Sequence, residues 1–252
     1  MLGLTKRASS MSYGKDIIDV GWLNTDQTAG CIWYPPQQNR RDDPKPAHAK
    51  AVNRCPAVVD FETRGFDVLC PYDLRLGIGA KDGKPVLINR DGANASIGSK
   101  HLMKAVTLLG RDQWRSPRLP VLQFRTPYIF VADDPVFINQ FPPFGYFRRD
   151  PLPGLVIGGR FPIDVWPRHL NWAFEWHDAS KDLVLRRGEP WFTVRFECAN
   201  PAARYRLVEA ERTPELDAYT SNIAGVTNYV RGTFSLFGMA ESHRPKKLLK
   251  AK

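Results

Sequence analysis

The chain has 252 residues and carries 36 lysines and arginines against 26 aspartates and glutamates, a formal net charge of +10. A charged fraction of 25% together with 12% aromatic residues excludes a chain that is disordered throughout. No apolar run approaches the roughly 18 residues that a membrane span requires, and the first residues lack the apolar stretch of a secretory signal. We therefore expect a basic globular protein without a membrane partner.

The N-terminal half predicts short strands joined by turns, in keeping with 21 prolines. Residues 1–15 are polar and predict a flexible arm. Strands are expected at 16–22, 29–34, 66–70, 72–76 and 85–88, and a polar surface loop at 37–54. The strand at 85–88 lies between Asp82-Gly83 and Asp91-Gly92, which are hairpin-type turn sequences.

The second half continues the strand pattern and then changes to a helical one. A short helix is expected at 100–110, followed by strands at 121–124, 128–131, 136–138, 154–158, 170–176 and 183–196, the last broken at 188–190. Thr213-Pro214-Glu215 is typical of a helix start, and apolar residues then recur every three or four positions, which predicts a helix over 214–231.

These elements predict a mainly β protein, a β-sandwich or distorted β-barrel with one C-terminal helix. The β domain is expected over 16–212 and the helical segment over 213–243. Residues 244–252 carry five basic side chains and no acid, and they predict a solvated basic tail. The four cysteines, at positions 31, 55, 70 and 198, form no Cys-x-x-Cys pair and are expected as reduced thiols in the core.

The segment 168–178 contains the densest set of chemically reactive side chains. As a strand, it places Trp172, Phe174 and Trp176 on one face. The other face then carries His169, Asn171, Glu175 and His177, with Asp164 and Asp178 nearby. Two imidazoles and a carboxylate suit a non-haem metal site, although eight residues of extended strand separate the histidines by about 27 Å. The alternative is an aromatic core face opposite a polar face. No cofactor other than a metal ion is predicted.

Four ordered segments resemble the motifs of dUTPase-type nucleotide hydrolases, which are trimers of β-barrels. The segments are Gly65-Phe66-Asp67, Gly154 to Ile157, the turn and strand from Leu185 to Phe192, and the glycines Gly232 and Gly238. The resemblance implies Asp67 as a catalytic candidate, with Glu175 as a second from the segment above. Gly158 stands where that family has an aspartate, so one carboxylate of its magnesium chemistry is missing.

A wider pattern covers residues 55–198. Its parts are a Cys-Pro start, Gly-Phe-Asp-Val and Cys-Pro-Tyr-Asp at 65–73, Phe-Arg-Thr-Pro-Tyr at 124–128, and Arg-Gly-Glu-Pro-Trp-Phe at 187–192. This pattern resembles a family of uncharacterised proteins from bacteria and tailed phages. The resemblance implies a phage-borne protein, in the host cytoplasm or in the virion, and it implies no activity.

Two surfaces are candidates for contacts with partners. Aromatic side chains crowd around Pro142-Pro143 and predict an exposed protein-binding surface, unless they belong to the core: Tyr128, Phe141, Phe144, Tyr146 and Phe147. The basic tail is a candidate for contact with polyanions through Lys246, Lys247, Lys250 and Lys252. The function that we expect is that of a structural or binding protein that acts in a homo-oligomer, and the alternatives are the nucleotide hydrolase and the metal enzyme.

Overall fold

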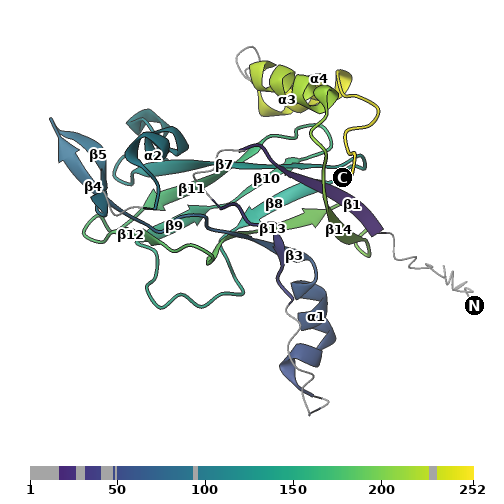
Figure 1. Ribbon diagram of the computed structural model, residues 1–252, viewed down its shortest axis with the longest axis horizontal. Coiled ribbons are helices and arrows are strands. Elements are labelled where there is room, and N and C mark those ends of the chain that lie inside the picture. Colours follow the sequence, from purple (N-terminus) through teal and green to yellow (C-terminus); the bar gives the residue numbers. More distant parts are fainter. Residues whose placement is uncertain (1–16, 27–31, 41–47, 49, 93–95, 227–231) are drawn as a thin grey trace, which may run out of the picture.

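A computed structural model of the protein describes residues 17–26, 32–40, 48, 50–92, 96–226 and 232–252. It confirms a mainly β fold, with three sheets and few helices (Figure 1). The predicted N-terminal arm, 1–15, lies outside the described residues. Residues 32–34 form no strand, so the described part of the strand predicted at 29–34 is wrong.

The largest sheet has six strands and contains both ends of the β domain. In order across the sheet these are β14 (Arg204–Glu209), β1 (Ile17–Asn24), β7 (Val121–Val131), β11 (His169–Trp176) and β9 (Gly154–Ile157), and β6 (Val106–Leu108) also pairs with β7. The pair β1–β14 is parallel, whereas the other pairs of this sheet are antiparallel.

Two smaller sheets complete the β structure. The five-stranded sheet runs in the order β10 (Gly159–Pro162), β8 (Phe137–Phe141), β13 (Pro190–Glu197), β3 (Gly65–Leu69) and β2 (Gln37–Gln38). The three-stranded sheet contains β12 (Leu183–Leu185), β4 (Leu74–Lys81) and β5 (Lys84–Asn89). Its hairpin turns at Asp82-Gly83, as predicted, with positive φ at both residues.

The inner faces of the two larger sheets meet in an aromatic core. Trp172 of the six-stranded sheet and Trp191 of the five-stranded sheet are almost fully buried, with ring centroids 5.6 Å apart. Phe124 lies 5.5 Å from Trp191 at a steep angle, and Phe130 lies 5.8 Å from Phe196. Because each of these rings removes a large apolar area from water, their burial contributes strongly to the stability of the fold.

The helices lie outside the sheets. They are α1 (Pro56–Glu62), α2 (Ser99–Ala105), α3 (Pro214–Val226) and α4 (Thr233–Ser242), with 3-10 turns η1 (Val52–Arg54) and η3 (Arg111–Gln113). The predicted start of α3 is confirmed: the hydroxyl oxygen of Thr213 accepts a hydrogen bond from the Leu216 amide at 3.1 Å. Helix α4 was not predicted. None of the helices in the described part of the chain is long and apolar enough to cross a membrane.

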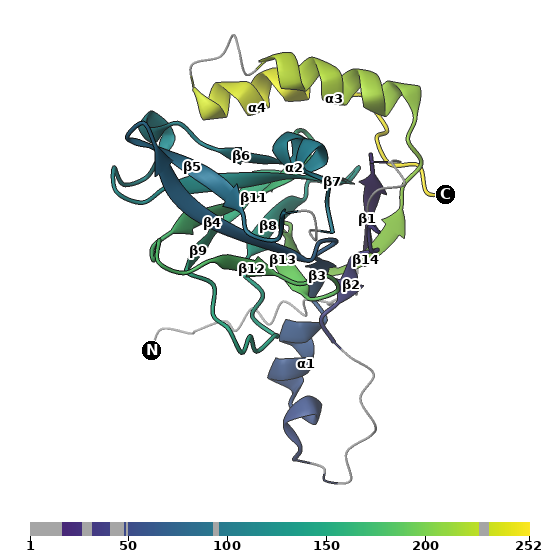
Figure 2. The same ribbon diagram turned by 60° about the vertical axis from the view of Figure 1, so that its left-hand side comes forward.

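A second core cluster holds α3 and α4 against the outer face of the six-stranded sheet (Figure 2). Ile129 and Val131 of β7 contribute to it from the sheet, and Leu216, Tyr219 and Ile223 contribute from α3. The Tyr219 hydroxyl, which donates, lies 2.7 Å from the Val165 carbonyl and 3.0 Å from the Ala240 carbonyl. The helix pair is therefore part of the folded body.

The interpretation of residues 244–252 as a solvated tail is wrong. Leu248 and Leu249 are buried in the second core cluster, and their amides donate to Asp133 Oδ1 at 2.6 and 3.1 Å. Ala251 forms a β-bridge with Ala210. The two leucines of this basic segment are therefore buried because they pack on apolar side chains of the cluster and because Asp133 accepts hydrogen bonds from their amides.

The described cysteines are free thiols. Cys70 is buried as predicted, and burial raises the pKa of its thiol to about 12. Cys55 is exposed at the start of α1, so its predicted place in the core is wrong.

Candidate functional site

Three adjoining cavities form a groove that runs from the outer face of the six-stranded sheet, beside α3, to the segment around α2. Their volumes are about 630, 560 and 400 Å³, and His169 lines all three. The central cavity shares Arg125 and Arg212 with one neighbour and Arg168 and Asn171 with the other. We call this feature the basic groove.

Strand register places the sheet residues of the groove side by side. Asn171 of β11 lies opposite Arg125 of β7, and His169 lies opposite Ile129. Because side chains alternate between the faces of a strand, these residues point outward while Leu170 and Trp172 enter the core. The alternation predicted for β11 is therefore confirmed, since Trp172, Phe174 and Trp176 are all buried.

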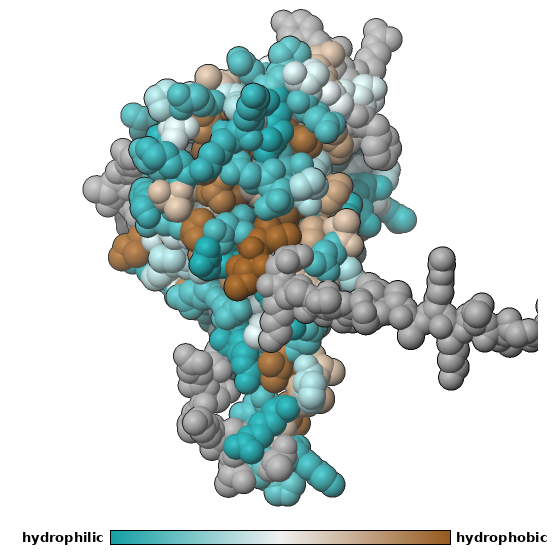
Figure 3. All heavy atoms as spheres, turned by 90° about the vertical axis from the view of Figure 1, so that its right-hand side faces the viewer, coloured by the Kyte–Doolittle hydropathy of each residue, from teal (hydrophilic) through white to brown (hydrophobic). Residues whose placement is uncertain are grey.

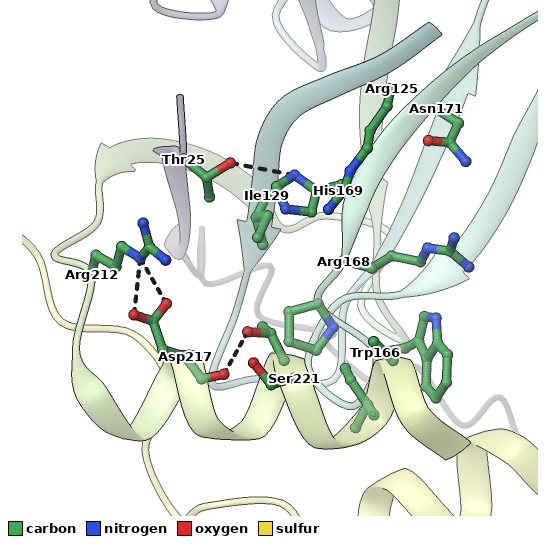
Figure 4. A pocket seen from close by; sticks show the side chains of 14 residues that line it. Thr25, Arg125, Ile129, Trp166, Arg168, His169, Asn171, Arg212, Asp217 and Ser221 are labelled. Carbon is green, nitrogen blue, oxygen red and sulfur yellow. Dashed lines mark hydrogen bonds and ion pairs between the residues drawn. The ribbon is translucent and has the colours of Figure 1, made fainter. Parts of the chain in front are cut away.

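Positive charge dominates the groove. The side chains of Arg125 and Arg168 make no ion pair or hydrogen bond within the described residues, whereas Arg212 Nε donates to both carboxylate oxygens of Asp217, at 2.8 and 2.9 Å. Figure 4 shows Arg125, His169 and Arg168 on one side of the central cavity and Asp217 and Ser221 of α3 on the other. Desolvation of the Arg168 guanidinium lowers its pKa, and the charge of Arg125 lowers it further.

His169 is neutral in this setting. Burial lowers the pKa of its ring, and the charges of Arg125 and Arg168 act in the same direction. Its Nδ1 lies 3.2 Å from the Thr126 carbonyl oxygen, which can only accept, so this nitrogen carries the proton. The Thr25 hydroxyl, 3.5 Å away, is already donating to the Pro127 carbonyl. The Nε2 atom is consequently left as a hydrogen-bond acceptor.

The structure does not gather the predicted metal ligands around one point. Glu175 is buried, and its Oε1 lies 2.9 Å from His177 Nε2, while its other oxygen lies 3.8 Å from Arg115. Asp178 instead accepts from Ser180 and pairs with Lys181. In the described part of the chain, no three His, Cys, Asp or Glu side chains lie close enough to hold a metal ion together.

Two further candidates from the metal and hydrolase hypotheses lie elsewhere. Asp67 is on β3 of the five-stranded sheet, where its Oδ1 accepts from Thr193 Oγ1 at 2.5 Å and from Asn39 Nδ2 at 3.0 Å. Asp164 precedes the groove residues but does not line the groove, and burial raises the pKa of its carboxyl. Asp67 and Glu175 therefore lie on different sheets, and neither lines the groove.

The end of β8 and the loop that follows it carry exposed aromatic rings. Phe141, Phe144 and Phe147 are exposed, Phe147 to 87%, and Tyr146 is half-buried. Tyr128 is fully buried, so its predicted place in an exposed surface is wrong: its hydroxyl donates to the Tyr34 carbonyl at 2.5 Å inside the core. The alternation of β7 explains this, because Tyr128 faces inward with Phe124 and Phe130.

Phe61 joins these rings, although no local pattern in the sequence singled it out. Its ring centroid lies 4.9 Å from that of Phe144, and the Arg195 guanidinium lies 4.7 Å from the Phe61 ring centroid. Phe61 belongs to α1, which projects from the body as an arm (Figures 1 and 2). Figure 3 shows apolar side chains on this arm and where it joins the body. We call Phe61, Phe141, Phe144 and Phe147 the aromatic surface.

The four lysines near the C-terminus divide into two pairs. Lys250 pairs with Glu211 at 2.7 Å, and Lys252 pairs with Glu209. Lys246 and Lys247 are exposed and make no ion pair within the described residues. Of the four lysines predicted to contact polyanions, two are thus engaged with acids of the chain itself.

Comparisons with known proteins add no relative to this picture. No protein-family model and no curated protein sequence matches the chain.

Proposed function

We propose that the chain is a binding protein that acts through protein–protein contacts at the aromatic surface, with a second copy of the chain as its partner. The supporting observation is that Phe61 and Phe144 pack on each other while both remain more than 40% exposed. Large exposed apolar patches on a folded chain mark interaction sites, and aromatic residues are enriched in them.

The neighbours of the aromatic surface suit an interface as well. Arg195 stacks on Phe61, and arginine is among the residues that concentrate binding energy at interfaces. Arg148 fixes the loop that carries Phe144 and Phe147, since its guanidinium donates to the Val184 carbonyl at 2.9 Å and to Glu189 at 3.0 Å. A loop held in this way loses little conformational entropy on association.

The simplest homo-oligomer consistent with this proposal is a two-fold dimer. Two copies related by a two-fold axis would each present the same surface, so that the exposed rings of one cover those of the other. Burial of each large ring contributes about 1.5–3 kcal/mol. The phage-type origin and a place in the virion rest on the sequence resemblance and remain predictions.

Sedimentation velocity of the purified full chain tests the proposal. We expect a dimer or larger species at about 100 µM and a monomer for the double variant Phe61→Ser with Phe147→Ser. The matched control is Met103→Ser, which removes an 80% exposed apolar side chain from α2, away from the arm (Figures 1 and 2). A monomeric wild-type chain, or an oligomer that survives the double variant, would refute the proposal.

A further inference from the structure

The basic groove carries positive charge that the described residues leave largely without acidic partners. Arg125 and Arg168 line the central cavity without a carboxylate partner in the described residues. Arg212 is the groove arginine with a close acid on the neighbouring helix, Asp217. Lys104 adds another charge in the adjoining cavity and forms no ion pair within the described residues. Among the described residues that line that cavity, Asp26 is the carboxylate, and its Oδ2 lies 3.2 Å from Trp33 Nε1.

Arg125 and Arg168 are both solvent-exposed, so water screens part of the repulsion between their like charges. Partial burial lowers the pKa of the Arg168 guanidinium, and the remaining repulsion from Arg125 lowers it further. Burial likewise lowers the pKa of His169, and the charges of Arg125, Arg168 and Arg212 add to that effect. A bound anion would remove this repulsion and would also be attracted by the focused field of the groove.

The other residues that line the central cavity indicate what kind of molecule would carry the anionic group. Ile129, Trp166 and Ile223 contribute apolar surface, and the neutral His169 and the amide of Asn171 contribute hydrogen-bonding groups. A cavity of about 630 Å³ is within the usual range for small-molecule sites. Helix α3 covers one side of it, which suits a small molecule better than a long polymer (Figure 4).

We propose that the basic groove binds a small phosphate ester, with its phosphate between Arg125 and Arg168 and its organic part against Trp166 and Ile129. Arginine suits a phosphate because its planar guanidinium donates two parallel hydrogen bonds to phosphate oxygens. The unprotonated Nε2 of His169 accepts from a hydroxyl of the organic part. This site is independent of the aromatic surface, which lies on the other sheet.

Isothermal titration calorimetry in a phosphate-free, low-salt buffer tests this proposal with pyrophosphate and ATP as probes. We expect saturable binding at one site per chain. Arg125→Ala and Arg168→Ala should each weaken it about tenfold or more, the usual effect of losing a charged hydrogen bond. The control is Arg118→Ala, which removes an exposed arginine that has no ion pair within the described residues and lies outside the groove. It should change the affinity less than about twofold.

Other outcomes would overturn the proposal. The absence of saturable binding by both probes would do so, as would equal weakening by Arg118→Ala, since general charge would then be responsible. A single-stranded oligonucleotide that binds far more tightly than ATP and depends on Arg125 would replace the small ligand with a polymer. Arg125→Gln, with its melting temperature, guards against a folding defect, and a pyrophosphate-dependent shift of the His169 ring resonances locates the binding.

Discussion

The two large sheets of the sandwich share one aromatic core but present different outer faces. On the six-stranded sheet, α3 and α4 cover the apolar outer residues Ile129 and Val131 and leave the charged ones, Arg125 among them, around an open groove. On the five-stranded sheet, Phe61 of α1 packs against Phe144, but the rings of Phe141 and Phe144 stay exposed.

The two outer faces differ in how far they depend on something outside the chain. The apolar outer residues of the first sheet are buried under α3 and α4. The residues of this face that stay accessible, in the basic groove, are mainly charged or polar. The exposed rings of the second sheet contribute hydrophobic stabilisation only when another surface removes them from water. This contrast is the basis of our two proposals, a small anion for the first face and a second copy of the chain for the second, and it can be tested by mutation.

The largest effect is expected in the aromatic core that the two sheets share. Trp172 is fully buried and its ring stacks with that of Phe174 at 5.5 Å, so Trp172→Ala should lower the free energy of unfolding by about 3–5 kcal/mol. Urea denaturation measures it. Phe147→Ala, at an exposed ring of the aromatic surface, should change the free energy by less than about 0.5 kcal/mol. Comparable losses would mean that Phe147 is part of the core.

A smaller effect is expected on the groove side alone. Asp133→Ala leaves the amides of Leu248 and Leu249 without their acceptor and should cost about 1–3 kcal/mol. Asp134→Ala is the matched control, because this neighbouring carboxylate is exposed and has no ion pair within the described residues. Amide hydrogen exchange at Leu248 and Leu249 should accelerate in the first variant only. Unchanged exchange would contradict the docking of this segment.

The electrostatics of the groove are open to NMR titration. We expect the ring of His169 to titrate below its ordinary pKa of 6.5, and Arg168→Ala to raise that pKa because a nearby positive charge is removed. Arg118→Ala should leave it unchanged. The lowered folded-state pKa means that the stabilisation by the neutral ring is complete above pH 6.5 and is lost as pH falls through the folded value. His169→Gln should therefore flatten the loss of stability on acidification, and an unaltered profile would argue against it.

The smallest effect is expected for an arginine of the same outer face that already has its acid. Arg206 donates to both oxygens of Asp19 at 2.7 Å, and both side chains are exposed enough for solvent to screen them. Arg206→Ala should cost less than about 1 kcal/mol, and the cost should shrink in high salt. Thermal melts at two salt concentrations measure it. A large, salt-independent loss would show that paired and unpaired arginines of this face do not differ as we describe.

Local patterns in the sequence predicted the features that depend on neighbours along the chain. The alternation of 170–176, the turn at Asp82-Gly83 and the helix start at Thr213-Pro214 all belong to this class, because period, turn chemistry and capping are read within a few residues. Aromatic density did not separate Tyr128 from Phe147, since both a core and a surface accumulate rings.

Features that depend on distant pairing were not predictable. The sequence pattern indicated His169 as a metal ligand. Its neighbours in the groove are instead set by the register of β11 on β7, which places Asn171 opposite Arg125. Arg212 carries no local signal, and it becomes part of the groove through the position of α3. The leucines at 248 and 249 stand among lysines, and only the apolar cluster under the helices explains their burial.

The parallel pairing of β1 with β14 has a consequence for synthesis on the ribosome. The Asp19–Arg206 pair that bridges these strands joins residues 187 positions apart. While the polypeptide grows, β1 can pair with β7 but must wait for nearly the whole β domain before its other edge is closed. Such long-range closure slows folding, and an unpaired edge strand invites other chains. A nascent chain of this protein is thus most exposed to aggregation, and has most to gain from a chaperone, in the interval before residues 204–209 emerge.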